Sequence, residues 1–92
     1  MKEQINSLIS RAAKNHGVRP EDLMGDNKRQ PISAARQEAM YIIRREFPHL
    51  SYESIAMTFN RTNHATVLYA IQQHKKRSAK IMTAAHLGLE LV

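Results

Sequence analysis

Apolar residues recur at helical spacing along most of the chain, and this periodicity constrains the fold more than any other feature of the sequence. Over residues 2–16 they form one stripe at i, i+3, i+4, i+7 and i+8, which is typical of an amphipathic helix. The stripe consists of Ile5, Leu8, Ile9, Ala12 and Ala13. Only three glycines and three prolines occur in 92 residues, too few for the many turns of an all-β fold. The sequence predicts an all-α fold, a compact helical bundle in which residues 1–92 form a single domain.

Local signals divide the first half into helices. Gly17 ends the first helix, and Pro20 suits the first position of a short helical turn. Ser33 is a suitable N-cap for a second long helix over roughly residues 34–47, which Pro48 closes. We expect the buried face of this helix to consist of Ala35, Ala39, Met40, Ile42, Ile43 and Phe47.

Two further helices are expected in the second half. Ser51 caps a short helix, and Asn60 stops it because asparagine tolerates the left-handed conformation. The next helix has Thr62 or Asn63 as its cap. Residues 78–88 are helical in composition, and the sequence leaves open whether they extend this helix or form a separate one. The inward-facing residues are expected to be Ile55, Ala56, Phe59, Val67, Leu68, Ala70 and Ile71.

Positive charge dominates the second half of the chain. The whole sequence carries a formal net charge of +6, and no acidic residue occurs between Glu53 and Glu90. The cations in this interval are Arg61, Lys75, Lys76, Arg77 and Lys80. This distribution favours nucleic acid or another anionic surface as the partner.

Several classes of function are disfavoured. The chain lacks cysteine, which rules out thiolate metal sites and makes a reducing cytoplasm the expected location. The five histidines include no i, i+3 or i+4 pair, so no metal is expected. We expect no membrane partner, because no signal-peptide core and no bilayer-length apolar run occur. We expect no enzyme activity, cofactor or nucleotide either, because His64 has no local nucleophile or carboxylate and no GxxxxGK[ST] loop is present.

Residues 51–75 have the form of a helix-turn-helix. A short helix of about two turns carries the small residue Ala56, where two helices must approach closely. A turn of three to four residues then leads into a helix that is polar at its start and apolar further along. In a helix-turn-helix, the second helix packs by its later residues and presents its N-terminal residues to the major groove.

The first turn of this second helix carries groups that suit DNA. Asn63 can both donate to and accept from an adenine edge, and His64 can bind purine N7 or O6. Ala65 and the methyl group of Thr66 can touch a thymine methyl. Arg61, in the turn, is placed for a phosphate, which the free N–H groups of a helix start also favour. A capped helix start on the surface, without any ligand, fits the same residues.

Two longer stretches, QPISAARQEAMYIIRREF and LSYESIAMTFNRTNHATVLYAIQ, resemble the C-terminal DNA-binding domain of the bacterial replication initiator DnaA. The family's Ala-Arg-Gln entry to its long helix is present as Ala35, Arg36 and Gln37. The family's Arg-Asp-His-Thr-Thr-Val motif reads TNHATV here. The resemblance covers roughly residues 3–77.

The resemblance implies a Trp-repressor-like helical fold that binds double-stranded DNA, in replication initiation, its regulation, or transcription regulation. It assigns base reading to Asn63, His64, Ala65 and Thr66. With the charge pattern, it places contacts to the DNA backbone or minor groove at Lys28, Arg29, Gln30, Arg36, Ser51, Arg61, Thr62 and Lys75. Two alternatives stay open: Arg36 as the structural partner of a carboxylate, and Lys75 on a solvated helix face.

Three departures from the family's motif bear on the DNA sequence that is bound. Asn63 stands where the family has aspartate, an acceptor-only group suited to cytosine N4. Ala65 stands where the family has its first threonine, and Thr62 where it has arginine. We therefore expect the target to differ from the family's DNA box.

A competing interpretation is a protein-interaction module that has kept the fold. The C-terminal extension, about residues 78–92, contains IMTAAHLGLELV, which is richer in apolar residues than a solvated tail needs. Through residues 81–92 the chain would form a homodimer or dock on a replication protein.

The remaining aromatic and basic residues are interpreted as structural. Tyr41, Tyr52 and Tyr69 are expected at the rim of the core, because too few aromatic residues are present for a single-strand binding groove. Arg44 and Arg45 are expected to be ordinary surface charges beside Glu46.

Overall fold

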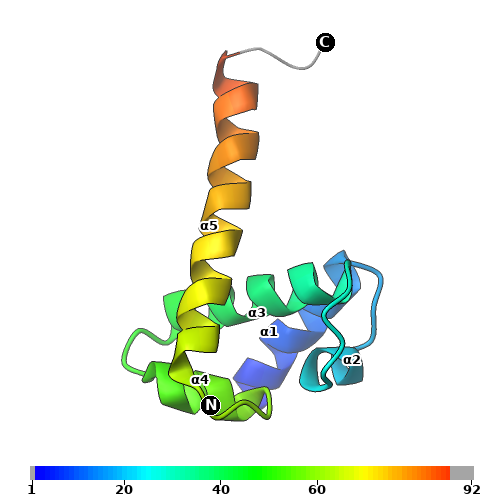
Figure 1. Ribbon diagram of the computed structural model, residues 1–92, viewed down its shortest axis with the longest axis vertical. Helices are drawn as coiled ribbons and strands as arrows, with labels where there is room; N and C mark the ends of the chain where they lie inside the picture. Colours follow the sequence, from blue (N-terminus) through cyan, green and yellow to red (C-terminus); the bar gives the residue numbers. More distant parts are fainter. Residues whose placement is uncertain (1, 88–92) are drawn as a thin grey trace.

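The computed structural model describes the backbone of residues 2–87 and the side chains of residues 2–77. Within this part of the chain every regular element is a helix (Figure 1), which confirms the all-α prediction. The helices are α1 (Lys2–Asn15), α2 (Pro20–Met24), α3 (Ile32–Glu46), α4 (Tyr52–Thr58) and α5 (His64–Leu87). None of the described helices is long and apolar enough to cross a bilayer.

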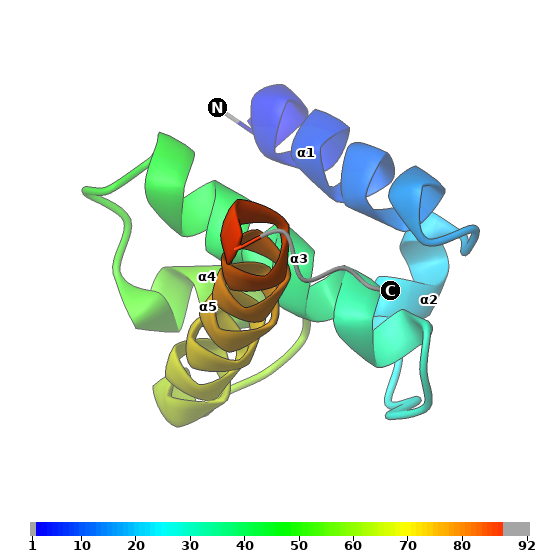
Figure 2. The ribbon, with the colours of Figure 1, turned by 90° about the horizontal axis from the view of Figure 1, so that it is seen from above.

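The third helix, α3, is the centre of the packing and contacts each of the other four helices. Seen from above (Figure 2), α1 lies on one side of α3, and α4 and α5 lie on the other. Every helix contributes to the core between them. Its largest fully buried side chains are Ile9, Leu23, Met40, Ile43, Ile55, Phe59 and Val67.

Three predicted helix boundaries are confirmed. Gly17 follows α1 with φ of +67°, a conformation in which a side chain would be strained. Asn60 follows α4 with φ of 58°, so it supplies the left-handed residue that ends this helix. Ser51 caps α4, and its hydroxyl oxygen accepts a hydrogen bond from the Ser54 backbone N–H at 3.1 Å.

The predicted start of α3 is wrong, because the helix begins at Ile32 and Ser33 lies inside its first turn. The backbone N–H of Ser33 already donates to the Arg29 carbonyl, and that of Ala35 donates to the Pro31 carbonyl, each at 2.9 Å. Pro31 can stand at the start because the N–H that proline lacks has no partner in a first turn. At the other end, α3 stops at Glu46, since a residue before proline disfavours helical geometry.

The long helix α5 shows whether residues 78–87 extend the second helix of the helix-turn-helix or form a separate one. It runs for 24 residues without a break, so residues 78–87 extend the second helix of the helix-turn-helix. At about 1.5 Å per residue its length is roughly 36 Å. Its C-terminal half stands clear of the other helices (Figure 1). The alternating segment at residues 88–92 lies outside the described residues.

Arg44 is a structural residue, which contradicts its interpretation as an ordinary surface charge. Its Nη1 donates to the Pro48 carbonyl at 2.9 Å and also to the Leu50 carbonyl. Its guanidinium lies over the Tyr52 ring, 4.7 Å from the centroid. Arg44 therefore holds the loop between α3 and α4 in place. Arg45 pairs with Glu46, as expected, and its guanidinium also lies 5.7 Å from the centroid of the Tyr41 ring.

A polar cluster joins the C-terminal end of α1 to α3. Glu38 accepts a hydrogen bond from Asn15 Nδ2 at 2.9 Å, and its Oε1 lies 3.0 Å from His16 Nε2. Burial raises the pKa of the Glu38 carboxyl, but these two hydrogen bonds outweigh it and hold the pKa below its ordinary value of 4.5. His74, whose ring lies 4.7 Å from that of Tyr41, is half-buried at the same junction. Burial lowers the pKa of His74 below 6.5, against the opposing charge of Glu38.

We expect the free energy of unfolding to fall as the pH is lowered from 7 to 4. As the pH falls below 6.5, His74 is protonated in the unfolded chain at a higher pH than in the folded chain, because folding lowers its pKa. Below pH 4.5 Glu38 behaves in the same way, because folding lowers its pKa too. Both groups therefore make stability rise with pH across these windows. Urea titrations at each pH measure it, and His74→Gln should remove the loss near pH 6.5 while His49→Gln, on the surface, should not. Higher stability at pH 6 than at pH 7 would contradict this.

Candidate nucleic-acid interface

The packing of α4 against α5 decides which side of α5 faces outward. Ile55 and Ala56 of α4 are fully buried, as is Val67 of α5. Residues 59–63 join the two helices, a turn somewhat longer than the three to four residues expected. His64 and Ala65 lie exposed on the first turn of α5. The structure thus has a helix that is packed by its later residues and open at its start.

Asn63, and not Thr62, is the N-cap of α5. Its side-chain Oδ1 accepts a hydrogen bond from the Ala65 backbone N–H at 2.9 Å. Its backbone carbonyl accepts a hydrogen bond from the Thr66 N–H at 3.1 Å. The capping bond uses the amide oxygen, so the amide Nδ2 is the side-chain group best placed to donate to an outside partner.

Arg36 is buried and binds the C-terminal carbonyls of α2. Only 7% of its surface is exposed. Its Nε donates to the Leu23 carbonyl at 2.8 Å, and its Nη2 donates to the carbonyls of Asp22 and Gly25, each at 3.2 Å. Burial lowers the pKa of Arg36, and the nearby Arg61 cation lowers it further. A position near phosphates was predicted for Arg36, with a carboxylate partner as the alternative. In the structure its partners are the backbone carbonyls of α2 and Gly25.

Arg61 approaches the same end of α2 from the helix-turn-helix turn. Its Nη2 donates to the Gly25 carbonyl at 2.8 Å, and its Nη1 to the carbonyls of Phe59 at 2.7 Å and Met24 at 3.4 Å. A helix end leaves carbonyls without partners and carries partial negative charge, which cations offset. We call Arg36 and Arg61 the arginine clamp, since together they bind the end of α2 to both α3 and the turn.

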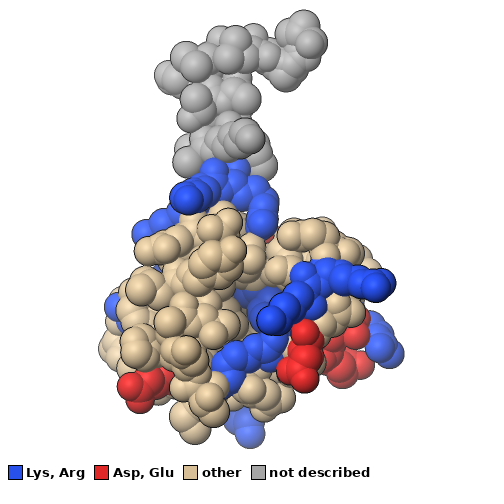
Figure 3. All heavy atoms as spheres, viewed as in Figure 1, with Lys and Arg blue, Asp and Glu red and all other residues tan. Residues whose placement is uncertain are grey.

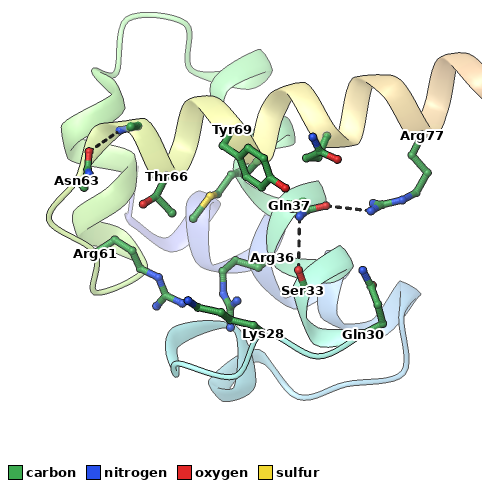
Figure 4. Close-up of a pocket in the computed structure, with 14 residues that line it drawn as sticks. Lys28, Gln30, Ser33, Arg36, Gln37, Arg61, Asn63, Thr66, Tyr69 and Arg77 are labelled. Carbon is green, nitrogen blue, oxygen red and sulfur yellow. Dashed lines mark hydrogen bonds between the residues drawn. The ribbon is translucent and has the colours of Figure 1, made fainter.

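A groove of about 700 Å³ opens between the α2–α3 loop and α5 (Figure 4). We call it the interface groove. Its cations are Lys28, Arg36, Arg61 and Arg77, and no acidic residue lines it. The other lining residues are Gln30, Ser33, Gln37, Met40, Asn63, Ala65, Thr66, Tyr69, Ala70 and Gln73. On the face of the molecule shown in Figure 3, Lys and Arg side chains cross the middle and the upper part, while the Asp and Glu side chains lie in the lower half. The groove therefore favours an anionic occupant.

The groove brings together predicted DNA-binding residues from separate parts of the sequence. From the loop, α3 and the turn come Lys28, Gln30, Arg36 and Arg61, and from the start of α5 come Asn63, Ala65 and Thr66. The predicted residues that do not line the groove are Arg29, Ser51, Thr62, His64 and Lys75. All five of these are exposed, so they remain available to a ligand larger than the groove.

Several residues of the interface groove were not predicted from the sequence, and Leu68 was predicted on the wrong side of α5. Leu68 was predicted to face the core, but it is 40% exposed, and Tyr69, predicted at the rim of the core, is 59% exposed. Gln73 and Arg77 follow Tyr69 at intervals of four, which places them on one face of the helix. This spacing was the available signal, and the apolar pattern around it obscured it.

In the part of the chain that the structure describes, no three His, Cys, Asp or Glu side chains lie close enough together to bind a metal ion. The groove instead combines guanidinium, ammonium, amide and hydroxyl groups, the donors that bind phosphate oxygens.

In its sequence the chain is similar to one part of several bacterial DnaA proteins. The chromosomal replication initiator protein DnaA of Thermus thermophilus is 38% identical over 66 residues, which is 72% of this chain and 15% of that protein. DnaA of Crocosphaera subtropica is 38% identical over 82 residues, covering 85% of this chain and 18% of that protein. DnaA of Aquifex aeolicus is 30% identical over 84 residues, covering 91% and 21%.

These matched regions amount to about a fifth or less of each relative. No solved structure gave a significant match. The family described as "Bacterial dnaA protein helix-turn-helix" matches residues 5–73, which include most of α1, all of α2 to α4 and the start of α5. With both helices of the motif in place, the chain belongs to the bacterial DnaA helix-turn-helix family.

Proposed function

We propose that this chain binds double-stranded DNA sequence-specifically, with the first turn of α5 in the major groove and the α2–α3 loop at the adjacent minor groove. The observation that carries this proposal is the interface groove, which has four cations, no acidic residue, and walls formed by these two elements. One sugar-phosphate strand separates a major groove from its neighbouring minor groove. The interface groove lies where that strand would pass.

Phosphate contacts supply most of the affinity, and base contacts supply most of the selectivity. Lys28 is the exposed loop cation that lines the groove, and it lies opposite Asn63 and Thr66 across it (Figure 4). His64 and Ala65 face outward beside Asn63 and complete the proposed reading surface. The arginine clamp holds loop and helix start at a constant separation, so the two can engage one duplex together.

The biological role that follows is in replication initiation, its regulation, or transcription regulation, at the nucleoid of a bacterial or phage-infected cell. The relatives carry the name of a replication initiator, and this chain corresponds to only a small part of them. Asn63, in place of the family's aspartate, favours a DNA site other than the family's box.

Selection of bound duplexes from a random-sequence library tests the proposal. We expect one enriched motif and a steep fall in affinity with salt. Lys28→Gln should leave the motif unchanged and reduce the slope of log K against log salt by about 1. Lys14→Gln is the matched control. It removes an exposed lysine from the last turn of α1, outside the groove, and should leave the slope unchanged. Binding without an enriched motif, or independent of salt, would refute sequence-specific recognition.

A second candidate function is self-association or docking on a replication protein through residues 81–92. The observation that favours it is the length of α5, which projects beyond the helices that pack against it (Figure 1). An isolated helix is marginal in water, and a partner would stabilise it. Light scattering on the full chain and on a chain ending at residue 80 separates the candidates. Equal monomer masses, together with retained DNA binding, would remove this one.

A further inference from the structure

Arg77 lines the interface groove at a distance from the helix-turn-helix reading surface. It lies on α5, roughly 20 Å along the helix axis from Asn63 at about 1.5 Å per residue. Its position continues the groove face of α5, on which Tyr69 and Gln73 precede it at intervals of four residues. Figure 4 shows its side chain directed toward α3, on the far side of the groove from Arg61.

A hydrogen-bonded relay connects Arg77 to the start of α3. Arg77 Nη2 donates to Gln37 Oε1 at 3.0 Å. Gln37 Nε2 in turn donates to Ser33 Oγ at 3.4 Å, and all three residues line the groove (Figure 4). A cation can only donate, so it holds the oxygen of the Gln37 amide toward itself and leaves the NH2 end facing Ser33.

Arg77 has fewer partners than a half-buried guanidinium normally has. Its Nη1 is buried and lacks a hydrogen-bond partner in the described part of the chain. Among the described residues the ion pairs are His16–Glu38, Arg19–Asp22 and Arg45–Glu46, so no carboxylate neutralises Arg77. Buried donors are almost always paired, so Nη1 of Arg77 is a donor that an added acceptor would satisfy.

We propose that Arg77 anchors a bound duplex by binding a backbone phosphate in the interface groove, so that the DNA-binding surface extends well beyond the start of α5. The phosphate oxygens would supply acceptors to Arg77 as its Nη1 edge turns toward the groove. The Gln37 amide NH2 stays on Ser33 Oγ, which keeps the Gln37 oxygen on Arg77 Nη2. Arg36 and Arg61, by contrast, are engaged by backbone carbonyls. Arg77 and Lys28 are the groove cations for which the described part of the chain shows no hydrogen bond to a backbone carbonyl.

This inference rests on the proposed function, and it adds a particular contact to it. Charges on one DNA strand follow one another at about 3.4 Å along the duplex axis. A groove that reaches from Asn63 to Arg77 therefore spans several phosphates. Because a phosphate contact carries no sequence information, Arg77 contributes to affinity and register and not to base selection.

The test compares Arg77→Met, which keeps an apolar stem, with Lys76→Met, which removes the neighbouring exposed charge outside the groove. The probe is the duplex that the unmodified chain selects, titrated between about 50 and 200 mM salt. Arg77→Met should weaken binding at least about tenfold and lower the salt slope by about 1, with the selected motif unchanged. Lys76→Met should have a much smaller effect on both the affinity and the salt slope. Arg77→Lys keeps the charge, so it should keep the slope.

A second measurement identifies the phosphate and removes the effect of any folding defect. Single neutral methylphosphonates are placed in turn along both strands of the duplex. One position should weaken binding of the unmodified chain and have little further effect on Arg77→Met. The proposal is overturned if no position shows this coupling, or if Arg77→Met binds with the affinity and slope of the unmodified chain. If the unmodified chain itself shows no salt-dependent binding, the proposed function fails, and this inference fails with it.

Discussion

Arg36→Met should destabilise the fold by about 2–4 kcal/mol, because it removes the donors from three carbonyls at the end of α2. Each buried acceptor that loses its partner costs about 1–3 kcal/mol. The Gly25 carbonyl keeps its hydrogen bond from Arg61, which limits the loss. Domains of this size are stable by only about 5–15 kcal/mol, so the loss is a large fraction of the total. The expected fall in Tm is roughly 10–30 °C. Urea titration followed by circular dichroism measures the change.

Arg45→Met is the matched control for this prediction, since it makes the same substitution on the same helix. Arg45 is exposed, pairs with Glu46 at 3.4 Å and lies 5.7 Å from the Tyr41 ring centroid, so its loss should change stability by less than about 1 kcal/mol. If Arg36 were a phosphate ligand alone, Arg36→Met would keep its stability and lose only DNA affinity. That result would contradict the structural role we assign to it.

Asn63→Asp should change the base preference at one position of the selected site while preserving the fold. Aspartate caps a helix as well as asparagine does, and its charge is favourable at a helix N-terminus. It offers acceptors only, which suits cytosine N4, whereas the Nδ2 of asparagine donates. We expect discrimination of about 1–3 kcal/mol, or roughly 5- to 150-fold, between the sites selected by the two proteins. Selection from a random library, followed by titration of both sites, measures it.

Two further variants separate capping from base reading. Asn63→Ala loses the cap and the donor together, so it should lower stability by about 1 kcal/mol and relax one base position. Ser51→Ala removes the cap of α4 at a similar cost in stability, and the motif should stay unchanged. If Asn63→Asp selects the same motif as the unmodified chain, Asn63 is only a cap.

Local chemistry explains why so much of the fold was predictable. The apolar stripe of α1, the left-handed Asn60 and the cap at Ser51 each depend on interactions within about four residues, which a sequence displays directly. The start of α3 was placed wrongly for a related reason. A serine near a helix start is a good cap wherever it stands, and the backbone bonds of Ser33 and Ala35 to earlier carbonyls decided the register.

The sequence by itself determined the helical class, the helix-turn-helix, the family and the positive charge of the second half. Only the tertiary structure decided which cations are available to a ligand. Arg36 and Arg61 are predicted phosphate ligands, and folding also brings the carbonyl end of α2 to them from 11 to 37 residues away. Arg77 looks like a solvated charge, but the packing of α5 on α3 places it in the groove beside Gln37. The partners of a long side chain depend on which elements meet, and sequence spacing does not contain that information.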